Sequence, residues 1–185
     1  MARTIYYTAT TLDGFLADDA GGLDWLFEVE GGDAPDGFAE FFAGVGAMAM
    51  GATTYRWVLD HEDLLGSPGK WREWYGDTPA WVLTHRDLPP VPEAAITFAH
   101  GDVAAVHAAM AAAAGERAIW IIGGGDLAGQ FADRGLLDEV VVDVAPVTVG
   151  AGAPLLPRRL TAAQLELVDV ERRGQFARLS YRVRR

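Results

Sequence analysis

One segment constrains the fold more than any other part of the chain. Ala118 to Ile122 is an apolar run typical of a buried strand, and Gly123-Gly124-Gly125 forms a turn after it. Helical spacing then runs from Leu127 to Arg134, and Val140 to Val149 is long enough to cross a sheet. A strand, a glycine turn, a helix and a second strand make a crossover unit, so we expect these two strands to lie parallel in one sheet.

The rest of the chain extends this alternation of strands and helices. Turn formers dominate the stretch from Asp18 to Asp36, which predicts exposed loops around one short helix, and an irregular connection is predicted before Tyr75. We therefore predict an α/β fold whose mixed, mostly parallel sheet is covered on both faces and carries an antiparallel hairpin at one edge. The further strands are predicted at Thr4 to Thr11, Val45 to Met50, Ala80 to Thr84 and Ala95 to Ala99. The helices are predicted at Leu23 to Leu26, at Phe38 to Gly44, after Thr53 and from Asp102 to Ala114. The hairpin is predicted at Leu165 to Arg172 and Gln175 to Val183, around Arg173-Gly174.

Composition narrows the classes of protein and ligand. The 185 residues suit one domain spanning residues 1–185, and half of them are apolar, enough for a substantial core. There is no cysteine and the four histidines lack metal-ligand spacing, so no structural metal is expected. The formal net charge of -11 disfavours nucleic-acid and membrane-surface partners, and Met1 to Phe15 has no signal-peptide pattern. We expect a cytoplasmic protein.

Two glycine turns carry the clearest chemical signal. Gly123-Gly124-Gly125 joins a buried strand to a helix, so the backbone is open to a ligand and the free amides of the helix start attract phosphate oxygens. The alternative is a tight turn whose glycines only permit close packing. The second turn, Gly51 followed by Thr53 and Thr54, repeats the arrangement, with hydroxyls that either donate to phosphate or cap the helix. A third strand ends at Thr84, His85 and Arg86, which brings a hydroxyl, an imidazole and a guanidinium together.

Four motifs stand in order along nearly the whole chain. They are Thr10-Thr11-Leu12-Asp13-Gly14, Met50-Gly51 with Thr54-Tyr55, Ile122 to Leu127, and Pro146 to Leu155. Together they resemble the dihydrofolate reductase-like superfamily. Within it, Leu127-Ala128-Gly129 and Leu136 to Val140 favour the C-terminal reductase domain family of the riboflavin-biosynthesis protein RibD.

The resemblance implies a three-layer αβα fold that lays NADPH across the carboxyl ends of its strands, and subunits that pair as a homodimer. It places Gly51, Thr53 and Thr54 on one side of the pyrophosphate, and Gly123, Gly124, Gly125, Asp126 and Leu127 on the other side. It places Ala9 and Leu16 beside the nicotinamide. It places Thr84, His85 and Arg86 around the adenosine and its 2′-phosphate. Ala52 stands where dihydrofolate reductases often carry an arginine, so the choice between NADPH and NADH stays open.

The implied activity is NAD(P)H-dependent reduction of a small heterocyclic or sugar-linked imine or carbonyl. The nearest named activity is 5-amino-6-(5-phosphoribosylamino)uracil reductase of riboflavin biosynthesis. A dihydrofolate or pterin reductase is one alternative, and a non-catalytic nucleotide-binding or sensor protein is another.

Hydride transfer to an imine or carbonyl also needs a proton or a hydrogen bond at the electronegative atom. The candidate catalytic acids are Asp13 at the first turn, Asp24 beside Trp25, and Asp143 within an otherwise apolar strand. Asp13 is alternatively only a turn former. Asp143 is costly to bury unless it has a partner or lines a pocket.

Overall fold

The computed structural model describes residues 2–30 and 37–184, arranged around an eight-stranded sheet in the order β5-β4-β3-β6-β1-β7-β10-β9. The six strands from β5 to β7 are parallel, β10 runs antiparallel to β7, and β9 pairs with β10 at the edge. The mixed, mostly parallel sheet with a terminal hairpin is thus confirmed. The strands are β1 (Thr4–Thr11), β3 (Val45–Gly51), β4 (Ala80–Leu83), β5 (Ile96–Ala99), β6 (Ala118–Gly123), β7 (Glu139–Ala145), β9 (Leu165–Arg173) and β10 (Phe176–Val183).

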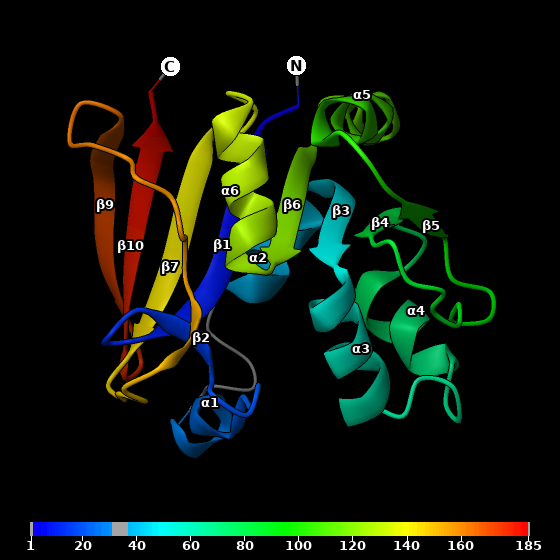
Figure 1. The fold of residues 1–185 in the computed structure, drawn as a ribbon, viewed down its shortest axis with the longest axis horizontal. Helices are drawn as coiled ribbons and strands as arrows, with labels where there is room; N and C mark the ends of the chain where they lie inside the picture. Colours follow the sequence, from blue (N-terminus) through cyan, green and yellow to red (C-terminus); the bar gives the residue numbers. More distant parts are fainter. Residues whose placement is uncertain (1, 31–36, 185) are drawn as a thin grey trace.

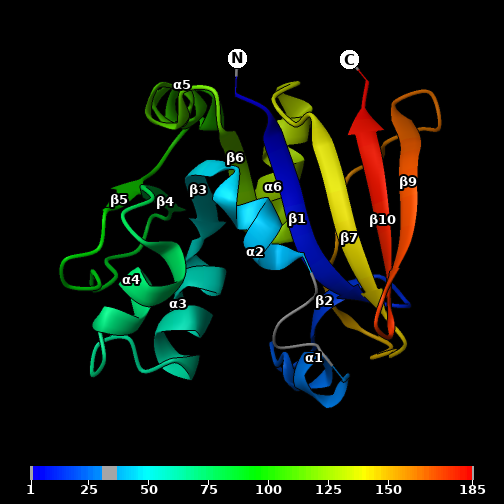
Figure 2. The ribbon, with the colours of Figure 1, turned by 180° about the vertical axis from the view of Figure 1, so that it is seen from behind.

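Helices cover both faces of this sheet. In Figure 1, α6 (Gly125–Asp133) crosses the near face, and α5 (Val103–Ala114) contributes to the same buried cluster, which includes Met110 and Phe131. Figure 2 shows α2 (Phe38–Ala43) and α3 (Ala52–His61) in front of the opposite face, where a second cluster includes Tyr55. This is the predicted three-layer αβα arrangement. None of the described helices is long and apolar enough to cross a membrane.

The first strand shows why such a sequence becomes a central strand. β1 occupies the predicted Thr4–Thr11, and it pairs with β6 on one side and β7 on the other. Successive side chains point to opposite faces, so Tyr6 joins one core cluster and Tyr7 the other. Because both faces are covered, β1 alternates between two apolar layers rather than between core and solvent.

Short-range patterns also located several boundaries. The Asp102 side chain accepts a hydrogen bond from the Ala104 amide at 3.0 Å, as expected of the cap of α5, and Gly115 follows the last helical residue. The hairpin turns at Gly174, whose φ of +59° is in the left-handed region that glycine tolerates.

The structure corrects four local predictions. The irregular connection contains a second helix, α4 (Gly69–Tyr75), because Trp71 is buried against Tyr55 and Tyr75. The long strand predicted to reach Val149 ends at Ala145. Helix α6 begins at Gly125, two residues before the predicted start.

The fourth correction lies in the segment predicted as loops around one helix. The helix is present as α1 (Asp24–Glu28), but β2 (Phe15–Asp18) precedes it and pairs antiparallel with β8 (Gly152–Pro154) in a small second sheet. This pairing joins distant parts of the chain, so no local pattern indicates it. The turn formers at residues 31–36 lie outside the described residues.

Candidate functional site

A cavity of about 740 Å³ opens at the carboxyl ends of the parallel strands. Every residue predicted to contact the cofactor lines it except Arg86, which lies outside its lining and is exposed. The predicted residues in the lining are Ala9, Leu16, Gly51, Thr53, Thr54, Thr84, His85, Gly123, Gly124, Gly125, Asp126 and Leu127. Segments that are far apart in the sequence therefore meet at one surface, as expected at the strand ends of an open α/β sheet.

The two glycine turns lie side by side because β3 and β6 are neighbours in the sheet. Met50 is in register with Gly123, and a Cβ placed on Gly51 would lie 3.9 Å from the Gly124 amide nitrogen. From these adjacent ends the chain leaves in opposite directions, into α3 on one face and α6 on the other. Two helix N-termini consequently point at the same cavity, which is the geometry that attracts an anion.

Neither helix start is capped by a side chain. Gly51 is the residue before α3 and Gly124 the residue before α6, and neither has a side chain to accept the first-turn amide hydrogens. Thr53 and Thr54 lie inside the first turn of α3. They do not occupy the cap position that the helix-capping alternative predicts. The Thr54 hydroxyl oxygen lies 3.3 Å from where a Cβ of Gly123 would be, so it stands between the two turns.

The three consecutive glycines serve different purposes. A Cβ on Gly124 would meet no atom within 4 Å, so the space beside this residue is free for a ligand. A Cβ on Gly125 would overlap the carbonyl oxygens of Pro154 and Leu155. Gly125 therefore allows the chain after β8 to pack closely, as the packing alternative predicts, whereas Gly124 leaves open space in which a ligand could approach the backbone. The peptide bond between Gly123 and Gly124 is cis.

Asp126, the one acid among the described residues that line the cavity, is held by neighbouring polar side chains. Its carboxylate accepts hydrogen bonds from Gln130 and from Arg158, each at 2.9 Å, and these bonds hold the pKa of Asp126 below its usual value. Arg158 also binds Asp133 at 2.7 Å. Asp126 thus shares the Arg158 guanidinium with Asp133, while its main-chain amide lies in the first turn of α6.

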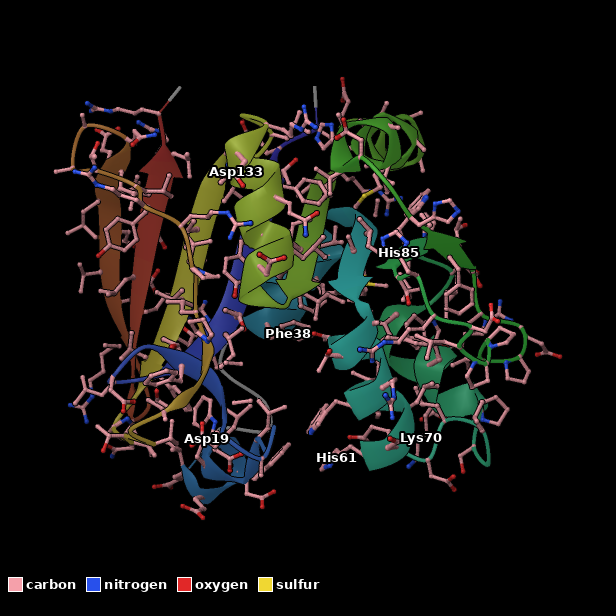
Figure 3. All side chains as sticks on the ribbon, in the orientation of Figure 1. Asp19, Phe38, His61, Lys70, His85 and Asp133 are labelled. Atoms are coloured by element: carbon pink, nitrogen blue, oxygen red, sulfur yellow. The ribbon has the colours of Figure 1, made fainter. Side chains whose placement is uncertain are left out.

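The outer end of the cavity carries two imidazoles. His85 follows β4 and His100 follows β5, and their ring centroids are 5.8 Å apart with an interplanar angle of 30° (Figure 3 labels His85). The hydroxyl of Thr84 accepts a hydrogen bond from the Arg86 amide at 2.9 Å. The sequence analysis missed His100, although its place directly after a strand parallel to β4 is the signal that identifies it.

The opposite end of the cavity is apolar. Ala9 and Leu16 meet Leu23 and Leu26 from the α1 region, and Trp57 faces them from α3. The Trp57 ring stacks on His61 with centroids 4.4 Å apart, and His61 stacks on Phe27 of α1 at 5.1 Å. Trp57 thus lies at the cavity wall with its ring held by stacking on His61 and Phe27.

Asp143 proves to be part of the core, not of the cavity. Arg178 of β10 lies opposite it in register and forms a bidentate ion pair with it at 2.7 Å for each contact. Tyr7 donates a hydrogen bond to the same carboxylate at 2.8 Å, and it also contacts Arg178. The buried acid therefore has its charged partner, Arg178, on a neighbouring strand of the sheet. The hydrogen bonds to Asp143 raise the pKa of Arg178. The pKa of Tyr7 is also raised, mainly by burial and to a smaller extent by the nearby Asp143 carboxylate.

The other two candidate acids also lie outside the cavity lining. Asp13 accepts hydrogen bonds from the Thr11 hydroxyl at 2.6 Å and from the amides of Val149 and Gly150, which fits the turn-forming alternative. These bonds, led by the one from Thr11, lower the pKa of Asp13. Asp24 is exposed at the first position of α1.

Comparison with known proteins places these features in a family context. The model of the RibD C-terminal domain matches residues 3–177. The uncharacterized Bacillus subtilis proteins YwjB and YyaP are 30% and 27% identical to the chain, over 97% and 83% of its length and 97% and 79% of theirs.

Solved structures share the fold of this chain. A putative riboflavin biosynthesis protein from Shewanella sp. PV-4 superimposes with a TM-score of 0.78 at 27% identity, covering all of both chains. A Thermotoga maritima deaminase and 5-amino-6-(5-phosphoribosylamino)uracil reductase shares the fold with a TM-score of 0.66 at 16% identity, over 99% of this chain and 57% of its own.

Proposed function

Because the chain belongs to the RibD C-terminal domain family, we propose that it is a reductase that uses NADPH or NADH to reduce a small heterocyclic or sugar-linked imine or carbonyl. The observation that carries this proposal is the pair of uncapped helix starts at adjacent glycine turns, both facing one cavity. The volume of this cavity, about 740 Å³, lies within the range of small-molecule sites, which is about 300–1,000 Å³.

The cradle fits the diphosphate of a dinucleotide. Open space beside Gly124 lets phosphate oxygens approach the backbone, and the first-turn amides of α6 point there. Across the cleft, the amides at the start of α3 and the Thr54 hydroxyl supply donors from the other side. These groups are fixed by the sheet before any ligand arrives, so little ordering is needed on binding.

The rest of the cavity divides by chemistry. Thr84 and His85 would receive the adenosine half, and Ala9 and Leu16 would flank the nicotinamide, which supplies the hydride when the cofactor is bound. The apolar wall beside Trp57 would hold the acceptor and exclude water.

The described lining offers no carboxylate at the substrate end, since Asp126 belongs to the diphosphate end and pairs with Arg158. A dihydrofolate or pterin reductase needs such a carboxylate to promote protonation of the pterin. The candidates Asp24 and Asp143 do not line the cavity. The absence weighs against pterin reduction. For reduction of a ribosylaminopyrimidine, which we favour among named activities, the proton would have to come from a hydroxyl group or a water molecule rather than from a carboxylate of the described lining. A nucleotide sensor would use the same cradle without turnover.

Titration with NADPH and with NADH, followed by isothermal calorimetry, tests the cradle. Oxidation of NADPH on adding 5-amino-6-(5-phosphoribosylamino)uracil, with dihydrofolate in a parallel assay, then tests the reaction. We expect binding, turnover of the ribotide and no turnover of dihydrofolate. Binding without turnover of any substrate supports the sensor, and failure to bind either dinucleotide refutes both roles.

We also propose that the protein forms a homodimer through the hairpin edge. β9 is an edge strand, and Leu167, Val168 and Val170 on it are 53%, 53% and 58% exposed. An exposed, apolar edge strand of this kind favours association with another chain. Light scattering coupled to gel filtration should give twice the chain mass of 19.8 kDa for the protein and a lower mass for Val170→Lys.

A further inference from the structure

The end of the cavity that would hold the hydride acceptor has walls of one chemical kind. Leu16, Leu23 and Leu26 line it from the side of β2 and α1, and Trp57 and Val58 line it from α3. Such walls stabilise the apolar part of a ligand by removing it from water. A phosphate group placed against them would lose its hydration without gaining a hydrogen-bond partner.

Phosphate sites in proteins are built from arginine, lysine or the start of a helix. Among the described residues that line the cavity, none is an arginine or a lysine. Arg56 precedes Trp57 on α3, but it is exposed and lies outside the lining. The starts of α3 and α6 face the cavity, and the proposed function assigns both to the diphosphate of the cofactor. His85 and His100 lie at the other end, after β4 and β5.

The segment that forms one wall of this end is acidic. Residues 13–30 contain no lysine or arginine, and their acids are Asp13, Asp18, Asp19, Asp24, Glu28 and Glu30 (Figure 3 labels Asp19). Asp24 begins α1 between two of the leucines that line the cavity, Leu23 and Leu26. No ion pair within residues 2–30 and 37–184 involves any of these six carboxylates. Their summed charge creates a negative potential at this end, which repels an anionic ligand.

We propose that the acceptor is an uncharged heterocycle without a phosphate group, so that the protein reduces a ribosylaminopyrimidine in preference to its ribosyl 5-phosphate. This inference rests on the proposed function, because it names the substrate class of the same cavity. A phosphate monoester carries a charge of about -1.5 to -2 at pH 7. At this end of the cavity it meets both a desolvation cost from the apolar walls and repulsion from the acidic segment, whereas a ribose hydroxyl meets neither at full strength.

The test compares 5-amino-6-ribosylaminouracil with 5-amino-6-(5-phosphoribosylamino)uracil as acceptors. The two compounds share the ring that is reduced, so the phosphate group alone distinguishes them. Steady-state oxidation of NADPH gives kcat/KM for each compound at about 0.01 M and about 0.5 M salt, a change that screens the acidic segment and leaves the apolar walls as they are. Calorimetric titration of each compound in the presence of NADP⁺ gives its Kd without turnover.

Two variants separate the local charge from the net charge of the protein. Asp24→Lys and Glu116→Lys each replace an exposed acid with a base. Asp24 lies beside the acceptor end of the cavity, whereas Glu116 precedes β6 at the opposite edge of the sheet. Thermal unfolding of both variants checks that the fold is intact.

We expect wild type and Glu116→Lys to favour the unphosphorylated compound by about tenfold or more in kcat/KM and in Kd at low salt, and by less at high salt. Asp24→Lys should improve use of the phosphorylated compound by about threefold to tenfold and change use of the other much less. A preference that ignores both salt and Asp24→Lys overturns the role of the acidic segment. If the phosphorylated compound is preferred, or if the two are used equally, the inference is wrong and the proposed function stands. If neither is bound or reduced, the inference is wrong, and the dinucleotide titrations decide whether the proposed function stands.

Discussion

Replacing Gly124 with valine should remove dinucleotide binding without unfolding the protein. A Cβ at this position meets no atom within 4 Å, so the side chain has open space beside the first turn of α6. The backbone there has φ of -84° and ψ of -179°, which any residue adopts. The fold should therefore accept the valine, whereas a diphosphate would collide with it.

The size of the effect follows from the donors that the valine would screen. Each hydrogen bond to a charged group contributes about 1.5–3 kcal/mol, so losing two of them weakens binding by about 100-fold or more. Gly125→Ala is the matched control, because its Cβ would overlap the carbonyl oxygens of Pro154 and Leu155 instead. Overpacking against backbone costs about 1–3 kcal/mol, and each kcal/mol lowers Tm by about 2–4 °C in a domain of this size.

Calorimetric titration with NADPH and thermal unfolding of both variants separate the two effects. We expect Gly124→Val to melt near wild type and to show no measurable binding, and Gly125→Ala to melt several degrees lower. The reasoning is refuted if Gly124→Val binds NADPH as tightly as wild type, or if it unfolds as readily as Gly125→Ala.

Three further results are expected. Arg178→Met leaves Asp143 buried without its bidentate partner and should destabilise the protein by about 3–5 kcal/mol in urea unfolding, with part of the loss recovered when Asp143→Leu is added. Asp13→Asn should have a lower free energy of unfolding than wild type at neutral pH, and this difference should disappear as the pH falls below about 4, because a carboxyl with a lowered pKa stabilises the fold only while ionised. A difference that stays constant with pH in urea unfolding contradicts this role. Trp57→Ala should raise the KM for the acceptor about threefold to tenfold through lost stacking while the Kd for NADPH stays unchanged, and steady-state kinetics with calorimetry distinguish this from general damage to the cavity.

The sequence predicted the parts of the fold that local patterns determine. Thr4–Thr11, the Asp102 cap and the turn at Gly174 follow from side-chain alternation, capping chemistry and backbone conformation within a few residues. The pairing of β2 with β8 joins residues far apart in the chain, and no local pattern carries that information. For the same reason α4 was missed, since the burial of Trp71 depends on contacts with α3.

The convergence of residues on one cavity could be predicted where they follow parallel strands, but not where the surroundings of a residue depend on a remote partner. Strand ends at Gly51 and Gly124 converge because neighbouring parallel strands end at one edge. The role of Asp143 depended on Arg178, which lies 35 residues later and reaches it only through the pairing of β7 with β10. Gly125 likewise looks like a second ligand-facing glycine until the chain after β8 is placed beside it.

A crystal structure of the protein with NADPH bound tests the central claim most directly. The account predicts the diphosphate between the two helix starts, with its oxygens within hydrogen-bond distance of main-chain amides in the first turn of α6 and of the Thr54 hydroxyl. A dinucleotide bound with its diphosphate away from Gly51 and Gly124, or bound outside this cavity altogether, would contradict it.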